Sequence, residues 1–370
     1  MEFVRDSAKQ IQLLSELLFS VPSSVEETAG KRPRLVPELA ASLGEVDLGS
    51  LERLAASNHV IVRGFAALRN AFENVGNDAG TGWINESLQR EQSRIDHALR
   101  YLSQICETLN ERGCLVTVIK SLDHVPDLGS DLDLYSDADS AAIIAAMKQA
   151  FGAKLADRSW GDRLANKWNF VVPGLPELVE VHVGRLGQTG EQTAAITRSV
   201  AECARVLEAG SYRFRVAAPE ERIVISTLQR MYRHFYIRLC DIVDNAKLLD
   251  DRAVDFDYLE SLGRQSGLWE GIATYLVIIS QYVEQYRGYG VPLSGRIVRS
   301  AKFGTSQVRF RKDFLRVSIL PHSIDLYARE LKSFLLRGDL RNGLRLSLLP
   351  CLATAAALEQ KITGSDKGIW

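Results

Sequence analysis

Between residues 114 and 218 the chain changes from helical periodicity to short β-branched or alternating apolar runs. CLVTVIKS (114–121) has the composition of a buried strand, and DLDLYS (131–136) alternates acidic or polar residues with apolar ones. KWNFVVPG and ELVEVHVG are joined by a turn rich in proline and glycine, which predicts a hairpin, and YRFRVAA (212–218) predicts a last strand. This segment therefore predicts the sheet-bearing part of the chain, with one helix over 140–151.

The region before this sheet, residues 1–113, predicts helices. A stretch rich in glycine and asparagine at 74–82 predicts a loop. After it the pattern predicts one long helix, with Asn85 as its cap and Gly113 at its end. Three shorter stretches have apolar residues at helical spacing: 3–19, 35–43 and 48–56.

The region after the sheet, residues 219–370, also predicts helices with short breaks. Pro219 followed by two glutamates is typical of a helix start. The predicted fold is thus α+β, with a small mixed sheet in 114–218 flanked by helical regions over 1–113 and 219–370.

Composition narrows the class of protein. The 370 residues are 46% hydrophobic and 25% charged with a formal net charge of -1, which predicts two or three globular domains and no global attraction to nucleic acid. The five cysteines form no CxxC motif and no Cys/His spacing typical of zinc, so we expect reduced thiols. The N-terminus does not have the pattern of a signal peptide, and no apolar run has membrane-spanning length. We therefore expect a cytoplasmic protein without a membrane partner.

Two aspartates in the predicted strand 131–136 carry the strongest chemical signal. Asp131 and Asp133 are two residues apart, so their side chains lie on the same face of a strand and repel each other unless a cation lies between them. Mg²⁺ binds carboxylate oxygens together with substrate phosphates. A third carboxylate, Glu180, lies in a later predicted strand, and Lys120 and Ser121 end the strand before Asp131. These residues predict a site for metal-assisted phosphate chemistry.

This arrangement resembles the nucleotidyltransferase superfamily with the DNA polymerase β-like fold, and within it the uncharacterised bacterial nucleotidyltransferase families. The matching segments are VIKS (118–121), SDLDLY (130–135), VEVHVG (179–184), VAAPEER (216–222) and YIRLCDIVDNAKLL (236–249), so the resemblance covers about residues 114–285. The chain departs from the pattern where Lys120-Ser121 replaces a glycine-containing turn, and where Glu180 replaces the commoner aspartate.

The resemblance implies transfer of a nucleoside monophosphate from a nucleoside triphosphate to an acceptor, with release of pyrophosphate and two Mg²⁺ ions as cofactors. His182, two residues after Glu180, either contacts the substrate or is a half-buried structural histidine. The implied catalytic metal ligands are Asp131, Asp133 and Glu180. The implied nucleotide contacts are Lys120, Ser121, Gly129, Ser130, Arg238 and Asp241.

Several of these positions have a plainer explanation. Gly129 and Ser130 serve a turn as readily as a phosphate, and Arg238 and Asp241 are spaced like a salt bridge on a helix surface. The segment 296–345 holds twelve lysines and arginines against four acidic residues. This surplus would attract RNA, or it pairs with acidic residues elsewhere in the chain.

Three hypotheses therefore follow from the sequence. The first is a nucleotidyltransferase whose acceptor is a small molecule, a protein or RNA. The second is a catalytically silent scaffold of the same fold that binds a nucleotide or a partner, and the altered turn at Lys120 and Ser121 motivates it. The third is a toxin that modifies RNA or tRNA.

Overall fold

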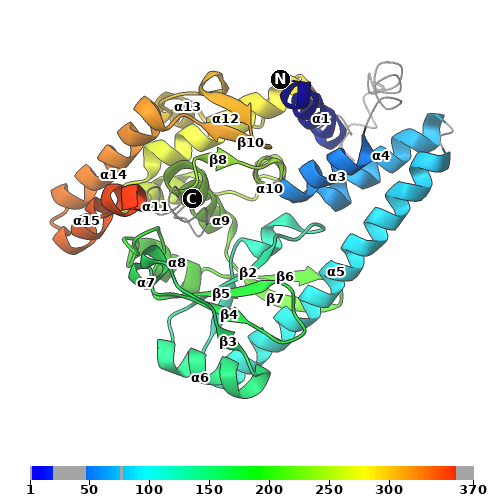
Figure 1. Cartoon of the computed structure of the whole chain (residues 1–370). Helices are drawn as coiled ribbons and strands as arrows, with labels where there is room; N and C mark the ends of the chain where they lie inside the picture. Colours follow the sequence, from blue (N-terminus) through cyan, green and yellow to red (C-terminus); the bar gives the residue numbers. More distant parts are fainter. Residues whose placement is uncertain (1, 20–46, 76–77, 356–370) are drawn as a thin grey trace.

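The structure is a computed structural model that describes residues 2–19, 47–75 and 78–355 (Figure 1). The helix predicted over 35–43 lies outside the described residues. The described helices of the first half of the chain are α1 (Glu2–Phe19), α3 (Leu48–Ser57), α4 (Ile61–Val75), α5 (Asp78–Glu111), α6 (Ser140–Phe151) and α7 (Trp160–Leu164). Those of the second half are α8 (Ala195–Glu202), α9 (Pro219–Thr227), α10 (Leu239–Asp250), α11 (Phe256–Ser266), α12 (Trp269–Arg287), α13 (Gly295–Ser300), α14 (Ile324–Leu336) and α15 (Leu340–Ser347).

The strands form two sheets among these helices, so the mixed α/β class predicted from the sequence is confirmed. The seven-stranded sheet has the order β3-β4-β5-β2-β1-β7-β6. Its members are β1 (Val116–Val118), β2 (Asp131–Ser136), β3 (Lys154–Leu155), β4 (Lys167–Val171), β5 (Leu178–Val183), β6 (Arg205–Ala209) and β7 (Tyr212–Val216). The three-stranded sheet consists of β8 (Tyr236–Ile237), β10 (Phe314–Val317) and β9 (Val308–Arg311), in that order.

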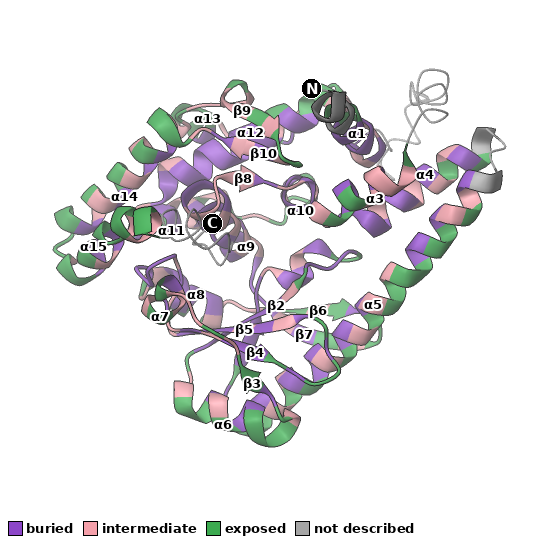
Figure 2. Ribbon diagram, viewed as in Figure 1, coloured by how far each residue is buried: buried purple, intermediate pink, exposed green. Residues whose placement is uncertain are grey.

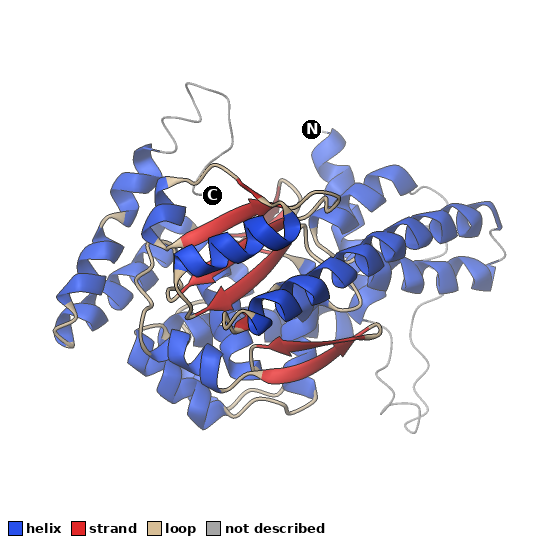
Figure 3. Ribbon diagram, turned by 90° about the horizontal axis from the view of Figure 1, so that it is seen from below, coloured by secondary structure: helices blue, strands red, loops and turns tan. Residues whose placement is uncertain are grey.

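The large sheet is mixed. β2 pairs with β5 and β1 with β7 in parallel, whereas the other neighbours are antiparallel, including the predicted hairpin of β4 and β5. Its apolar face packs against α5 and α6 in one hydrophobic core. Figure 3, seen from the α6 side, shows helices lying across this face. A second core joins α1, α3 and α4 to α9–α12 on the opposite side of the sheet. The central strands are accordingly buried on both faces (Figure 2).

The loop predicted over 74–82 is wrong, because α4 extends to Val75, α5 already begins at Asp78, and Asn85 is inside α5. Residues 76–77 lie outside the described part. Packing explains the difference: Ile84 is fully buried, and the Trp83 ring lies 5.8 Å from the Phe65 ring of α4. Burial of these side chains outweighs the low helix propensity of the nearby glycines.

The all-helical C-terminal region is also a wrong prediction, because β9 and β10 form a hairpin there. Its turn residues, Lys312 and Asp313, both have positive φ angles of 49° and 65°. Such turns usually carry asparagine and glycine, so this sequence lacks the ordinary hairpin signal. The helix that starts at Pro219 ends at Thr227, and the π-helical turn η3 (Leu228–Arg233) and β8 separate it from α10.

Short turns complete the fold: η2 (Ser121–His124), η4 (Thr305–Gln307) and η5 (Ile319–Ser323). The sequence also missed two edge strands, β3 and β6. Among the described helices, none combines the length and the apolar character that crossing a membrane requires. All five cysteines are free thiols, as expected.

Candidate active site on the polar face of the sheet

The pairing of β2 with β5 brings the predicted acidic residues together. Asp133 lies directly opposite Glu180 in the parallel register, and Asp131 lies one pleat earlier on the same face of β2. The intervening side chains, such as Leu132 and Val179, point to the other face and are fully buried in the core with α5 and α6. Alternation of polar and apolar residues therefore produces one acidic face on two adjacent strands.

Asp133 is the most enclosed of the three carboxylates, with 7% of its surface exposed. Its Oδ1 forms an ion pair with Lys120 Nζ and lies 3.3 Å from His182 Nε2. Burial opposes ionisation, but Lys120 and His182 outweigh burial and hold the pKa of Asp133 below its usual range. Asp133 is therefore an anion at neutral pH.

His182 is buried and lies on the same face, opposite Tyr135 of β2. Burial lowers its pKa to about 4, so its imidazole is neutral at pH 7 and can accept or donate one hydrogen bond at each nitrogen. The nitrogen that faces away from Asp133, Nδ1, has no hydrogen-bond partner in the described part of the chain. His182 is thus poised to contact a bound molecule.

Glu180 forms an ion pair with a second lysine, Lys167. Lys167 of β4 places Nζ 3.0 Å from each oxygen of Glu180 and 3.1 Å from Asp162. Among the described residues, Asp131 is the one carboxylate of the three without an ion pair. Burial and the nearby charges of Asp133 and Glu180 raise the pKa of Asp131 to about 6. The carboxylates of this site therefore outnumber the two lysines that pair with them, and the excess negative charge lies at Asp131, the first residue of β2.

This raised pKa predicts how stability depends on pH. The pKa of Asp131 rises from 3.8 to about 6 on folding, so the unfolded chain loses this proton first and the free energy of unfolding falls between those pH values. In metal-free buffer, Asp131→Asn should raise the free energy of unfolding by about 1–2 kcal/mol at pH 7.5 and change it little at pH 4. Urea denaturation at both pH values measures this, and a less stable variant at pH 7.5 would contradict it.

Lys120 reaches Asp133 because of an unusual backbone turn. Its φ and ψ are 62° and -57°, and the amide of Ser121 donates a 2.6 Å hydrogen bond to the carbonyl of Ile119. These are the marks of a γ-turn with positive φ, which a residue with a side chain rarely adopts. Strained backbone of this kind is concentrated at functional sites.

Ser121 fixes this turn to β2 through its hydroxyl. Ser121 Oγ accepts a 2.7 Å hydrogen bond from the amide of Asp133 and donates one of 3.1 Å to the carbonyl of Asp131. Both its hydroxyl and its amide are therefore engaged with backbone atoms. Lys120, and not Ser121, is the residue of this turn whose side chain faces the carboxylates.

Gly129 and Ser130 lie beside a different cavity. This cavity has a volume of about 300 Å³ and is also lined by His59 and Arg94. Arg94 donates hydrogen bonds to the carbonyl of Gly129, at 3.3 Å, and to Glu177, at 2.6 Å. Ser130 Oγ is 3.4 Å from Asp131 Oδ2, so this cavity adjoins the acidic face at the start of β2.

Arg238 and Asp241 occupy structural positions at the start of α10. The carboxylate of Asp241 accepts a 2.7 Å hydrogen bond from the amide of Arg238 and forms a buried ion pair of 2.6 Å with Arg230. The guanidinium of Arg238 donates to His59 Nε2 at 2.5 Å. The salt bridge expected between Arg238 and Asp241 is thus a capping contact, and the ionic partner of Asp241 is Arg230.

Sequence reasoning did not select Gln229 and Arg233, which line a pocket together with Lys120 and His182. Both residues lie on the π-helical turn η3, and π-helical turns often mark functional sites. Burial, then the charges of Arg233, Arg230, Arg238 and Lys120, lower the pKa of His234. Positive charge is therefore concentrated around His234, and Lys120 and Arg233 bring part of it to this pocket. The helical pattern of the sequence gives no signal for this turn.

A scan against models of protein families finds no match for this chain, and a search of curated protein sequences finds no significant relative.

Proposed function

We propose that this chain is a Mg²⁺-dependent nucleotidyltransferase, with the small nucleotidyltransferase core formed by the sheet region. The observation that supports this best is the shared face of β2 and β5, which groups Asp131, Asp133 and Glu180 next to the Lys120 turn. Three carboxylates with cationic side chains on the adjoining elements are what the binding of a metal-complexed triphosphate requires.

The donor set suits Mg²⁺. Asp131, Asp133 and Glu180 offer carboxylate oxygens, and burial together with the two other carboxylates raises the pKa of Asp131, which a bound cation would counteract. These residues would hold the ions, which when bound polarise the α-phosphate and neutralise the charge that develops there. Lys120 and Arg233, which line one pocket, would pair with the β- and γ-phosphates.

In the proposed reaction an acceptor oxygen forms a bond to the α-phosphorus. The bond from that phosphorus to the bridging oxygen breaks, and pyrophosphate leaves with the electron pair. Glu180 accepts the proton of the acceptor. The acceptor is a small molecule, a protein side chain or RNA, and the basic segment 296–345 motivates the RNA variant. Arg296 and Arg329 of that segment already pair with Asp257 and Asp325.

The test has two readouts, because the acceptor is unknown. Equilibrium dialysis with each nucleoside triphosphate should show binding that requires Mg²⁺ and is lost in the double variant Asp131→Asn/Asp133→Asn. Incubation with α-labelled triphosphates and cellular extract should transfer label only with the wild-type chain. Absence of both binding and transfer with all four triphosphates would refute the proposal.

A second candidate function is a silent scaffold of this fold, and a specific observation favours it. Lys120 and Lys167 already neutralise Asp133 and Glu180, as ammonium groups do when they replace a metal ion. This scaffold binds a nucleotide without Mg²⁺ and transfers nothing. The dialysis experiment separates the two functions, because only the enzyme requires the metal for binding.

Lys120 gives a further prediction. Lys120→Gln keeps a polar, unbranched side chain, one atom shorter, but removes the charge that we assign to phosphate binding. We expect the dissociation constant for the Mg²⁺–triphosphate complex to rise about 10- to 100-fold, as for the loss of a hydrogen bond between charged groups. Lys148→Gln is the matched control, because Lys148 is exposed on α6 beyond the other face of the sheet. Unchanged binding by Lys120→Gln would contradict the assignment.

A further inference from the structure

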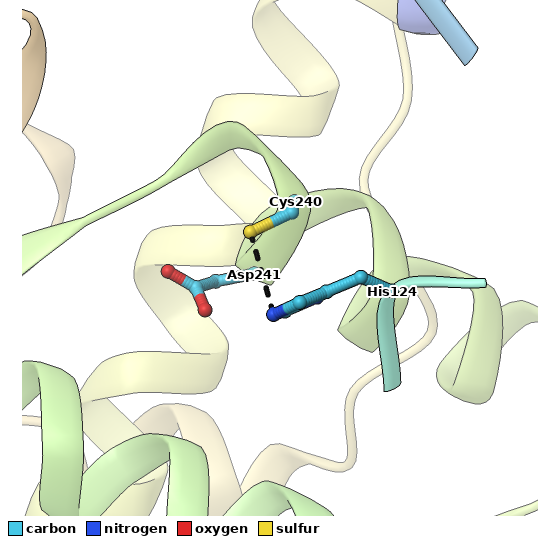
Figure 4. A group of neighbouring side chains, drawn as sticks. All are labelled: His124, Cys240 and Asp241. Carbon is cyan, nitrogen blue, oxygen red and sulfur yellow. Dashed lines mark hydrogen bonds between the residues drawn. The ribbon is translucent and has the colours of Figure 1, made fainter. Parts of the chain in front are cut away.

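A second group of metal-binding side chains lies outside the acidic face, between η2 and the start of α10. His124 comes from η2, and Cys240 and Asp241 come from the first turn of α10 (Figure 4). One ligand atom from each residue lies within 4.8 Å of the other two. His124 Nε2 and Cys240 Sγ face each other at 3.8 Å. The histidine and the cysteine are 116 residues apart in the chain, so no sequence spacing indicates this group.

We propose that His124, Cys240 and Asp241 form a binding site for one Zn²⁺ ion. Nitrogen, thiolate and carboxylate donors together match Zn²⁺ better than Mg²⁺ or Ca²⁺, which prefer oxygen alone. Zn–N and Zn–S bonds of about 2.0 and 2.3 Å at a tetrahedral angle place the two donor atoms about 3.5 Å apart. The observed 3.8 Å needs only a small adjustment of side chains.

The histidine is held as a zinc ligand requires. His124 Nδ1 lies 2.5 Å from Asp244 Oδ2, and Asp244 is fixed in turn by Arg63 at 2.6 Å. A carboxylate on one ring nitrogen orients the imidazole and leaves the other nitrogen for the metal, the usual arrangement behind zinc-bound histidine. Nε2 is the nitrogen that faces Cys240.

Asp241 retains one oxygen for the ion. Its hydrogen bond from the amide of Arg238 and its ion pair with Arg230 both use Oδ2, so Oδ1 is the oxygen outside those two contacts. The carboxylates of Asp127, Asp241 and Asp244 face the guanidinium groups of Arg63 and Arg230 and the imidazole of His124. Zn²⁺ binding would release the protons of the Cys240 thiol and of His124 Nε2, so the ion would replace those protons at this group.

Burial distinguishes this group from a catalytic triad. A Cys–His–Asp triad needs its thiol open to substrate, but Cys240 has no exposed surface. A metal ion needs only a narrow opening, and the ring of His59 is what separates the group from the nearest cavity. It stacks on His124 with centroids 5.8 Å apart and also lines the 300 Å³ cavity beside Gly129. Because His124 follows Ser121 by three residues, bound Zn²⁺ would steady the turn that carries Lys120.

The test uses the full chain, stripped of metal by a chelator and kept reduced, without nucleotide or Mg²⁺. Titration with Zn²⁺ against a chromophoric chelator should give one tight site per chain, and Cd²⁺ should produce the ultraviolet charge-transfer band of a metal–thiolate bond. Cys240→Ser should remove the band and weaken Zn²⁺ binding at least 100-fold. Asp244→Asn should weaken it about 10- to 100-fold by releasing the ring of His124.

Cys114→Ser is the control, because Cys114 is a buried free thiol in the other core. The proposal is overturned by absence of a tight site, or by Zn²⁺ binding and a Cd²⁺ band that persist in Cys240→Ser. His124→Gln provides an independent variant if Cys240→Ser does not fold. The assay needs no transferase activity, so failure of this site leaves the proposed function standing, and the reverse also holds.

Discussion

Asp133→Asn is expected to lower Mg²⁺-dependent nucleotide transfer about a thousandfold, which corresponds to about 4 kcal/mol of transition-state stabilisation. Asp133 has the central position on the acidic face, between Lys120 and His182 and opposite Glu180. Asparagine keeps the shape of the side chain but has no charge and only one oxygen for a metal ion. The measurement is the rate of label transfer at saturating triphosphate.

The control for Asp133→Asn must separate chemistry from folding. Glu208→Gln removes a carboxylate from β6 of the same sheet, where 77% of its side chain is exposed, and should leave the rate unchanged. Thermal unfolding shows whether Asp133→Asn is folded at the assay temperature. A folded variant that retains a tenth or more of the wild-type rate would remove Asp133 from the metal site.

The acidic face could be predicted because it depends on local geometry. Alternation along a strand requires Asp131 and Asp133 to share a face whatever the rest of the chain does. The hairpin of β4 and β5 was equally local, since a turn joins the two strands. The parallel pairing of β2 with β5 then brings Glu180 opposite Asp133. That pairing follows from the topology of the whole sheet, and only the resemblance to a family suggested it.

Side-chain contacts between segments that are distant in the sequence could not be predicted in this way. Lys167 neutralises Glu180 because β4 is the antiparallel neighbour of β5, and His59 reaches Arg238 across 179 residues of chain. Neither contact leaves a pattern in a single sequence. Helical spacing predicted an ion pair of Arg238 with Asp241, but α10 begins only at Leu239, and Asp241 pairs with Arg230 instead. Long-range packing had overridden local propensity.

Backbone conformation is the other part that the sequence concealed. Lys120 adopts a positive φ angle although it has a side chain, and glycine is the residue expected in such a turn. Lys120 thus places a charged side chain on a backbone conformation that glycine usually adopts. This is the physical reason to assign Lys120 a direct part in binding, because strain at this residue needs a compensating use.

Arg63→Met is expected to lower the free energy of unfolding by about 3–5 kcal/mol, the largest effect on stability that we predict. Arg63 of α4 lies 2.7 Å from Asp127 and 2.6 Å from Asp244, and it also donates to the carbonyl of His124 at 3.2 Å. It joins the N-terminal helices to the turn after η2 and to α10. Methionine fills similar volume but leaves buried Asp127 without its cation and Asp244 with His124 alone. Urea denaturation at pH 7.5 measures the change.

Two matched variants test whether the bridge itself causes the loss. Arg69→Met changes an arginine on the same helix whose pair with Glu73 is 3.8 Å long and 40% to 54% exposed, so we expect a change within about 0.5 kcal/mol. Arg63→Lys keeps the charge but cannot bridge both carboxylates with a planar fork, so its stability should lie between that of the wild type and Arg63→Met. Equal stability of Arg63→Met and Arg69→Met would mean that Asp127 and Asp244 find other compensation. In that case Arg63 is not the residue that holds α4 to α10 and to the turn after η2.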